Sequence, residues 1–314
     1  MTEETPSRIV LIAGPTAGGK SALALALAQQ IDGEILNADA MQVYRDLNVL
    51  SARPGTDDLA RARHHLFGVL SGASACSAGR WARMAGAALR AVSARGRPAI
   101  VVGGTGLYFR ALTDGLSPIP EIPEAVRRDG EARRAALGAA AFHAEVLAAD
   151  PSMARVAQGD AQRLVRAWSV HAATGRPLSD FQAAAGRPAA PRPAARIVLE
   201  PPRAALYARC DARFDAMMAA GALDEARRLA GAGYAPDRPV MKALGAAELI
   251  AHVRGEIALD EAVEAALRNT RRFAKRQGTW FRGQTPDWPR AETVSAALEA
   301  LKQQLGAPAS PAPP

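Results

Sequence analysis

Residues 9–21 read IVLIAGPTAGGKS, a short apolar run that passes into a complete G-x-x-x-x-G-K-S phosphate-loop pattern. In this pattern glycines let backbone N–H groups turn toward phosphate oxygens, the lysine reaches the outer phosphates and the last hydroxyl can ligate Mg²⁺. The following SALALALAQQI, at 21–31, predicts a helix whose positive end faces the anion. A chance Gly-rich turn is the alternative. We expect a polyphosphate site, by default for a nucleotide such as ATP, made of Gly14, Pro15, Thr16, Ala17, Gly18, Gly19, Lys20 and Ser21.

The composition describes a globular chain with a basic surface. Its 314 residues are 49% hydrophobic and 22% charged, enough for one large core or for one core with an insertion. The net charge of +8 fits a polyanionic partner such as a nucleic acid, although an Arg-rich and Ala-rich composition also arises from a GC-rich genome. Charge alone therefore leaves the partner open.

Cysteine usage and hydropathy bear on location. Cys76 and Cys210 lie far apart without a C-x-x-C pair, which argues against a disulfide framework or a zinc site and favours a reducing compartment. The segment MTEETPSR at 1–8 has no apolar signal region, and no apolar run approaches the roughly 20 residues of a membrane span. We expect a cytoplasmic protein without membrane contact, acting as a monomer.

Three further apolar runs, at 34–36, 99–102 and 196–199, are typical of buried parallel strands. Helical patterns separate them; the one at 77–94 places Trp81, Met84, Ala88 and Val92 near one face. Alternating strands and helices predict an α/β fold with a doubly wound parallel sheet. Ligands then bind at the carboxyl ends of the strands, where Gly14, Asp39 and Gly103 fall.

The chain changes character after residue 115. SPIPEIPE at 117–124 is punctuated by proline, and 124–184 shows helical patterns without a strand-like run. A Pro/Arg/Ala linker at 186–193 precedes the strand at 196. Further helices are predicted within 203–231 and at 260–282, and the tail is of low complexity. We expect a first part of the core at 1–115, a helical insertion at 116–195, core completion with basic helices at 196–306 and a disordered tail at 307–314.

Asp39 is the strongest candidate for an acid near the phosphate loop. The strand at 99–102 runs into Gly103 without a carboxylate, so the acid usual in nucleotide hydrolases is missing there. Asp39 follows the strand at 34–36, and polar residues follow it in turn. At such a position a carboxylate could act as a general base or hold Mg²⁺ through water. A turn or helix-capping role is the alternative.

Three other constellations could carry chemistry. The GGTG run at 103–106 offers a close backbone approach and the Thr105 hydroxyl, or is a tight strand-to-helix turn. Arg209 and Arg213 share a helix face and could reach a diphosphate, or pair with neighbouring acids. The third is a basic stripe at helical spacing, which repels itself unless it meets phosphate, and it comprises Arg268, Arg271, Arg272, Lys275 and Arg276.

Eight segments together resemble the tRNA dimethylallyltransferases, also called isopentenyl-tRNA transferases. In order and spacing they cover nearly the whole chain: GPTAGGKS at 14–21, DAMQVYRDLNV at 39–49, VGGTGLYFRAL at 102–112, GLSPIPEIP at 115–123, DAQRLVRA at 160–167, RFDAMMAAGALDE at 213–225, KALG at 242–245 and TRRFAKRQGTWFR at 270–282. The resemblance implies a phosphate-loop NTPase-like parallel sheet core with a helical insertion domain.

The resemblance also implies a reaction. A dimethylallyl group passes from dimethylallyl diphosphate to the exocyclic amine of the adenosine at position 37 of tRNA, just 3′ of the anticodon, and pyrophosphate leaves. Mg²⁺ on Ser21, with Lys20 and Arg213, would offset the charge of the leaving group. By analogy with the family, Asp39 is the base, Thr105 contacts the same nucleotide, and Arg213 completes the catalytic set.

The resemblance also implies contacts between this chain and the tRNA. The insertion would grip the anticodon stem, while the basic stripe holds RNA phosphates. The individual residues assigned to tRNA contacts are Asp39, Ala40, Met41, Gln42, Thr105, Arg127, Gln162, Arg163, Leu164, Val165, Arg166 and Lys242. This chain departs from the family pattern at Ala40, usually serine, at 50–54 and at Gly245-Ala246. A small-molecule kinase and a non-catalytic RNA-binding scaffold are the alternatives.

Overall fold

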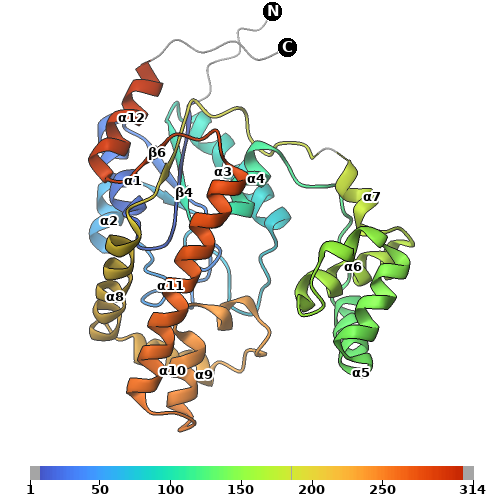
Figure 1. Ribbon diagram of the computed structural model, residues 1–314. Coiled ribbons are helices and arrows are strands. Elements are labelled where there is room, and N and C mark those ends of the chain that lie inside the picture. Colours follow the sequence, from blue (N-terminus) through green and yellow to red (C-terminus); the bar gives the residue numbers. More distant parts are fainter. Residues whose placement is uncertain (1–7, 185, 307–314) are drawn as a thin grey trace, which may run out of the picture. The chain divides into compact units, whose positions relative to one another are not determined.

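The computed structural model describes residues 8–184 and 186–306 (Figure 1). The tail expected to be disordered at 307–314 and nearly all of the segment at 1–8 lie outside the described residues. The chain forms two compact units. The first runs up to Thr113 and resumes at Ala189, and the second is Asp114–Pro188.

The first unit is built on a six-stranded sheet in the order β3-β2-β4-β1-β5-β6, in which every neighbouring pair is parallel. The predicted α/β class with a parallel sheet is confirmed. The four apolar runs became the four central strands, whereas the two edge strands have only two residues each and were not predicted. The strands are β1 (Ile9–Ala13), β2 (Glu34–Asn37), β3 (His64–His65), β4 (Ala99–Gly103), β5 (Ala195–Leu199) and β6 (Arg290–Ala291).

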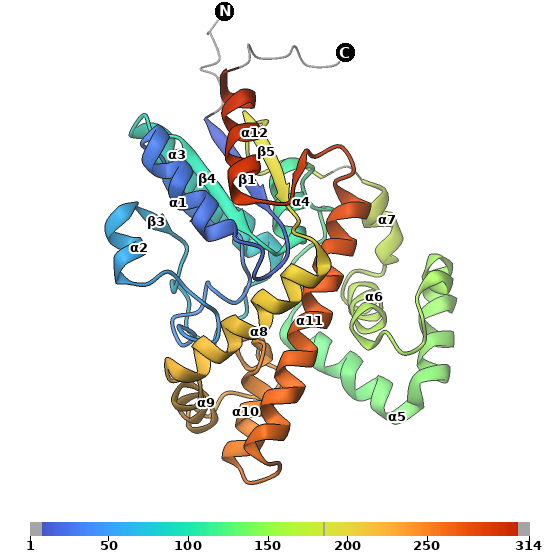
Figure 2. The ribbon, with the colours of Figure 1, turned by 60° about the vertical axis from the view of Figure 1, so that its left-hand side comes forward.

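Helices cover both faces of the sheet (Figures 1 and 2). On one face α1 (Lys20–Ile31) and α12 (Val294–Gly306) enclose the main apolar core with alternate residues of the strands. On the other lie α3 (Ala78–Ala94) and α4 (Gly106–Thr113). Of the four residues predicted near one face of α3, Trp81 and Val92 are buried, and Met84 and Ala88 are partly buried. Helical spacing centres the buried stripe on Trp81, Ala82, Ala85, Gly86, Leu89 and Val92.

A helical bundle lies beyond the carboxyl ends of the strands. Figure 2 shows α8 (Arg203–Ala219) crossing α11 (Leu259–Gln284), with α9 (Ala222–Gly231) and α10 (Ala246–Val253) beside them. The short helices α2 (Thr56–Arg61) and η2 (Pro239–Lys242) lie in connections of this unit. The segment predicted as one or two helices at 203–231 is two, because the chain turns at Gly221 with a φ of 95°.

The second unit is helical. It comprises α5 (Glu124–Ala149), which is interrupted at Gly138, then η1 (Pro151–Arg155), α6 (Ala161–Thr174) and α7 (Leu178–Ala183). Its ends meet in a bridge between Leu116 and Arg187. The sequence predicts the insertion at 116–195, and the compact unit in the structure spans Asp114–Pro188. The linker after Pro188 belongs to the first unit because the N–H groups of residues 189 and 190 donate to the carbonyls of Ala111 and Leu112 in α4.

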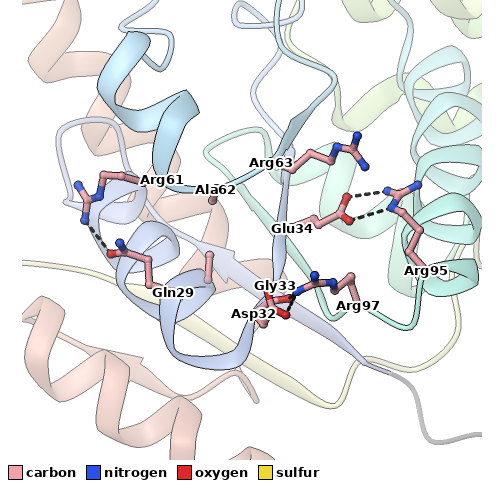
Figure 3. A pocket seen from close by; sticks show the side chains of 10 residues that line it. Gln29, Asp32, Gly33, Glu34, Arg61, Ala62, Arg63, Arg95 and Arg97 are labelled. Carbon is pink, nitrogen blue, oxygen red and sulfur yellow. Dashed lines mark hydrogen bonds and ion pairs between the residues drawn. The ribbon is translucent and has the colours of Figure 1, made fainter.

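The amino edge of the sheet carries an arginine-rich cavity of about 520 Å³, shown in Figure 3. Its centre is Glu34 at the start of β2, whose two carboxylate oxygens accept hydrogen bonds from Arg95 at 2.9 and 2.6 Å. The Oε2 atom of Glu34 also lies 2.5 Å from Nε2 of His65. Hydrogen bonds from Arg95, above all, lower the pKa of Glu34 to about 2. Because Asp39 follows the opposite end of β2, this cavity lies away from the predicted phosphate site.

We expect Glu34→Gln to destabilise the fold at neutral pH. The folded-state pKa of Glu34 lies below its unfolded value, so its stabilisation is present above that unfolded value and is lost as pH falls from about 5 toward 2. The cost at pH 7 should be about 3 kcal/mol, since the pKa falls from 4.5 to about 2 and each pKa unit corresponds to about 1.4 kcal/mol. Urea unfolding at pH 7 and pH 3 measures it.

The matched control is Glu299→Gln, which removes an exposed pair with Lys302 on α12 and should cost under about 0.5 kcal/mol. An equal cost of Glu34→Gln at both pH values would contradict the electrostatic explanation.

Within the described ranges, no helix combines the length and apolar character needed to cross a bilayer.

Candidate active site

The phosphate loop joins β1 to α1. Gly14 has a φ of 146°, and a Cβ there would lie 2.3 Å from the carbonyl oxygen of Leu199, so only glycine fits beside β5. Gly19, with a φ of 96°, precedes the first residue of α1, and no side chain caps the helix. The first N–H groups of α1 have no side-chain acceptor there, which suits an anion.

Lys20 lies over this loop. Its Nζ donates to the carbonyl oxygen of Pro15 at 2.6 Å. Burial lowers the pKa of the Lys20 ammonium to about 8; the Asp39 carboxylate acts in the opposite direction, and the Arg213 charge reinforces the effect of burial. A buried amine with this pKa favours a bound anion, which would restore its charge.

Arg213 reaches the same loop from α8. Its Nη2 donates to Oγ1 of Thr16 at 2.6 Å, and burial lowers its pKa. The alternative of a structural pair with Asp211 is not realised, because Asp211 pairs with Arg271 at 3.3 Å. Arg209, one turn before Arg213, is exposed. Of the two arginines on this face, Arg213 therefore contacts the phosphate loop.

Asp39 follows β2, and its side chain makes the contact expected of a turn-capping residue. Its Oδ1 accepts the backbone N–H of Met41 at 2.9 Å, which is the turn-capping role. The buried side chain of Asn37 holds its backbone from both sides, accepting from the N–H at 2.8 Å and donating to the carbonyl at 3.0 Å. The second carboxylate oxygen has no hydrogen bond to the described residues, so it stays available for chemistry.

Thr105 lies against the Asp39 turn. Its Oγ1 accepts the backbone N–H of Ala40 at 2.9 Å, and its N–H donates to the carbonyl of Ala38 at 3.2 Å. A Cβ on Gly103 would lie 2.1 Å from that same carbonyl oxygen, so β4 must end in glycine here. The GGTG run is thus a tight turn between β4 and α4 that also joins Thr105 to the Asp39 loop. Thr105 accepts the backbone N–H of residue 40, so this contact does not need the serine hydroxyl that the family usually has at that position.

The other predicted RNA contacts of the first unit lie nearby or on its surface. Ala40, Met41 and Gln42 are half-buried, and the amide of Gln42 donates to the carbonyls of Ser51 and Ala52 at 2.9 and 3.0 Å. Lys242 is exposed at the end of η2.

The basic stripe lies on α11. Arg268, Arg272, Lys275 and Arg276 are exposed, and the guanidinium of Arg276 lies 5.6 Å from the ring centre of Phe273. Among the neighbouring aromatics Phe281 is buried, so it belongs to the core. Four of the five cations of the stripe therefore form a solvent-facing surface of positive charge, suited to a nucleic-acid backbone, whereas Arg271 is half-buried and paired with Asp211.

The remaining predicted contacts lie in the second unit. Arg127 is on α5, where it donates to Glu131 at 2.5 Å, and Gln162 to Arg166 are on α6. Gln162, Arg163 and Arg166 are exposed, whereas Leu164 and Val165 are buried in the core of this unit. Of the five predicted residues on α6, the side chains exposed to solvent are therefore those of Gln162, Arg163 and Arg166.

Sequence reasoning missed three polar residues that support this site. They are Asn37 behind Asp39, Gln277 on α11, and Glu225, which accepts the N–H groups of residues 48–50 at 2.9 Å. All three are buried. A polar side chain at a core position of a strand or helix is the signal that could have found them.

The arrangement brings an anion cradle, two cations and a carboxylate to one edge of the sheet. The described segments contain no group of three or more His, Cys, Asp or Glu residues able to hold a metal. The chemistry that fits is departure of a phosphate-type group, held by Lys20 and Arg213, with Asp39 placed to accept a proton from an incoming nucleophile.

Two family models match the chain. Residues 42–284 match the family described as IPP transferase, and residues 7–68 match the one described as Isopentenyl transferase. A tRNA dimethylallyltransferase of Phenylobacterium zucineum (strain HLK1) is 56% identical over 286 residues, which are 90% of this chain and 92% of that protein. Another from Caulobacter sp. (strain K31) is 52% identical over 95% of this chain and 97% of its own.

Solved structures share the architecture. A full-length tRNA isopentenylpyrophosphate transferase from Bacillus halodurans matches with a TM-score of 0.68 and 28% identity over 96% of this chain and 97% of that one. A eukaryotic dimethylallyltransferase acting on tRNA matches with a TM-score of 0.78 over 95% and 77%, and at 23% identity its likeness concerns the fold alone. The predicted phosphate-loop core is thereby confirmed, as is the resemblance read from the sequence.

Proposed function

The chain belongs to the IPP transferase family, and on that premise we propose that it transfers a dimethylallyl group from dimethylallyl diphosphate to N6 of adenosine 37 in tRNA. The observation that carries the proposal is the geometry of the sheet edge. A phosphate loop held by Lys20 and Arg213 faces a carboxylate at Asp39, and β4 ends without the acid that a nucleotide hydrolase uses. A loop built this way suits a leaving pyrophosphate rather than an attacking water.

The reaction exchanges one bond for another. The bond from the allylic carbon to the diphosphate oxygen breaks, its electron pair leaves with pyrophosphate, and a bond forms from N6 to the same carbon. Negative charge therefore grows on the diphosphate as the carbon becomes cation-like. Lys20 and Arg213, fixed before the reaction by the Pro15 carbonyl and the Thr16 hydroxyl, are placed to offset that charge.

Mg²⁺ fits the hydroxyl of Ser21. This side chain is exposed at the start of α1 and has no hydrogen-bond partner in the described part of the chain. Mg²⁺ takes oxygen ligands and keeps several waters, so Ser21 and diphosphate oxygens would hold it without a carboxylate cluster. When bound, the ion would supply further charge compensation for the leaving group.

Asp39 acts on the other substrate. The exocyclic amine of adenine is a poor nucleophile because its lone pair is delocalised into the ring, so its proton must be accepted as the new bond forms. The Asp39 carboxylate, held by Asn37 and by the Met41 N–H, is the proposed acceptor. Thr105, on the adjacent turn, contacts the same nucleotide in this proposal.

The RNA reaches the site with its target base out of the stack, which an anticodon loop permits at lower cost than a duplex. We assign phosphate contacts to the exposed cations of the α11 stripe and to Lys242. In the second unit, Arg127, Gln162, Arg163 and Arg166 are proposed to contact the anticodon stem.

The proposal is tested by incubating the chain with unmodified tRNA, dimethylallyl diphosphate and Mg²⁺, then digesting the RNA and weighing its nucleosides. We expect adenosine heavier by one dimethylallyl group, only when both substrates are present. Consumption of ATP without modified tRNA would instead support the kinase alternative. RNA binding without any turnover would support the scaffold alternative.

We expect diphosphate binding to take up protons near pH 8. The pKa of Lys20 is about 8 in the free protein, and a bound anion favours the charged form. About half a proton should be taken up at pH 8 and almost none at pH 6.5, where Lys20 is already charged. Affinity for dimethylallyl diphosphate should therefore fall as pH rises above 8. Calorimetric titrations in buffers of different ionisation heat measure the uptake.

The matched control for this titration is Lys20→Met. Protons exchanged by the diphosphate itself appear with both proteins, so the difference between them reports Lys20. Equal uptake by the two proteins at pH 8 would contradict the assignment.

A further inference from the structure

Gln277 joins the two halves of the site. It lies on the buried face of α11, only 7% exposed, between the phosphate loop and the GGTG turn. Its Oε1 accepts the backbone N–H of Thr16 at 2.8 Å, and its Nε2 donates to the carbonyl oxygen of Gly104 at 2.9 Å. One partner is a donor and the other an acceptor, so a single orientation of the amide satisfies both.

The backbone around Gln277 is packed for this contact. A Cβ on Gly104 would lie 2.3 Å from Nε2 of Gln277 and 3.3 Å from the carbonyl oxygen of Gly14. One turn along the helix, Trp280 covers Gly106, where a Cβ would lie 2.2 Å from the indole. Helix α11 can therefore approach the turn only because residues 104 and 106 are glycine.

Each loop that Gln277 bonds carries the machinery for one substrate. Thr16 also accepts from Arg213 in the diphosphate half. Gly104 precedes Thr105, whose backbone and hydroxyl bond the residues on either side of Asp39. Gln277 is the one side chain in the described structure that hydrogen-bonds to both the phosphate loop and the GGTG turn.

We propose that Gln277 is a positioning residue that fixes the diphosphate loop against the Asp39–Thr105 edge, so that the allylic carbon and N6 meet at reacting distance. The inference rests on the proposed function, which supplies the two substrates. The proposal assigns Gln277 no contact with either substrate, because its two polar atoms are bonded to Thr16 and Gly104. Its effect is on the separation of two sites that each remain complete without it.

The consequence is a selective loss of rate. Without Gln277, Lys20 and Arg213 still bind diphosphate, and Asn37 still holds Asp39, so both substrates should bind. Misplacing reacting atoms by about 1 Å can cost about 100-fold in rate. We therefore expect the Gln277→Met enzyme to show a kcat lower by about 10- to 100-fold, with both KM values within about threefold of the wild type.

The first experiment compares Gln277→Met, which conserves the side-chain volume and removes both hydrogen bonds, with Gln277→Glu. The glutamate keeps the acceptor toward Thr16 but sets a carboxylate oxygen against the Gly104 carbonyl, which repels it, so its kcat should be no higher than that of Gln277→Met, with a raised KM for the diphosphate from its charge. The control is Gln284→Ala, an exposed glutamine on the same helix, which should keep the wild-type kcat. Steady-state kinetics with tRNA and dimethylallyl diphosphate give the values, and thermal melting checks the fold.

A double-mutant cycle separates positioning from general destabilisation. Gly104→Ala places a methyl group 2.3 Å from Nε2 of Gln277, too close for the present contact, and so should break the same link from the other side. If the link is the cause, the double variant Gly104→Ala/Gln277→Met loses about as much kcat as either single variant. The Gly104→Ala variant tests the link even if Gln277→Met folds poorly.

A wild-type kcat in Gln277→Met, or losses of kcat that multiply in the double variant, would overturn the proposal. So would a fall in activity that follows only the folded fraction. Failure of the proposed function is distinct, because then the wild-type chain itself would transfer no dimethylallyl group.

Discussion

Asp39→Asn should lower the rate of dimethylallyl transfer by about 10³-fold, the middle of the range that general-base catalysis contributes. The amide has the size of the carboxylate and can still accept the Met41 N–H, so the turn after β2 should keep its shape. What it cannot do is accept the proton of N6. Asp39→Ala should abolish transfer as well, and tRNA affinity should stay within about threefold of wild type for Asp39→Asn. Single-turnover transfer and filter binding of tRNA measure the two quantities.

The control is Asp32→Asn, an exposed aspartate just after α1 at the opposite edge of the sheet. It should leave both rate and affinity unchanged. Transfer that survives in Asp39→Ala would mean that another group accepts the proton. A parallel loss of tRNA affinity and rate would mean that Asp39 binds rather than reacts.

The parts of the site that lie within a few residues of a strand could be predicted from the sequence. An apolar run marks each central strand, and parallel strands end at one edge of the sheet, so Gly14, Asp39 and Gly103 had to lie near one another. The spacing of the phosphate loop then specified which residues face an anion. These inferences need only local pattern and one topological rule.

The supporting contacts depend on pairs of residues far apart in the chain. Gln277 is 261 residues from Thr16, and Glu225 is 175 from Leu50. Nothing local to either residue specifies its partner, because both partners are set by where α9 and α11 lie in the bundle beyond the ends of the strands. The two-residue strands β3 and β6 could not be predicted for a related reason. Each is held in place by pairing with a neighbouring strand, and two residues are too few to show an alternation pattern.

Asp39 shows that two interpretations of one residue can hold together. The sequence offered a capping role or a catalytic one, and the carboxylate has two oxygens. Oδ1 caps the turn, which fixes the orientation of the group. The other oxygen is thereby placed without being used. A hydrogen bond within the turn thus fixes the orientation of the carboxylate that we propose as the base.

Arg213→Ala should lower kcat by about 10²- to 10³-fold, the loss seen when one preorganised donor to developing negative charge is removed. The guanidinium is fixed on Thr16 before any substrate arrives, so little of its interaction is spent on ordering the side chain. Since the charge of the diphosphate grows as the allylic bond breaks, the effect should fall mainly on kcat and less on KM for the diphosphate. Arg213→Lys should recover part of the rate, because it keeps the charge and loses the planar fork.

The matched control is Arg209→Ala, one turn earlier on α8 with an exposed side chain, which should leave kcat within about twofold of wild type. Pyrophosphate release and appearance of modified adenosine, followed in the same reaction, should fall together in Arg213→Ala. If instead KM for the diphosphate rose and kcat stayed constant, Arg213 would bind ground state and transition state alike. Its contact with Thr16 would then serve to shape the loop, and Lys20 would carry the charge compensation on the protein side.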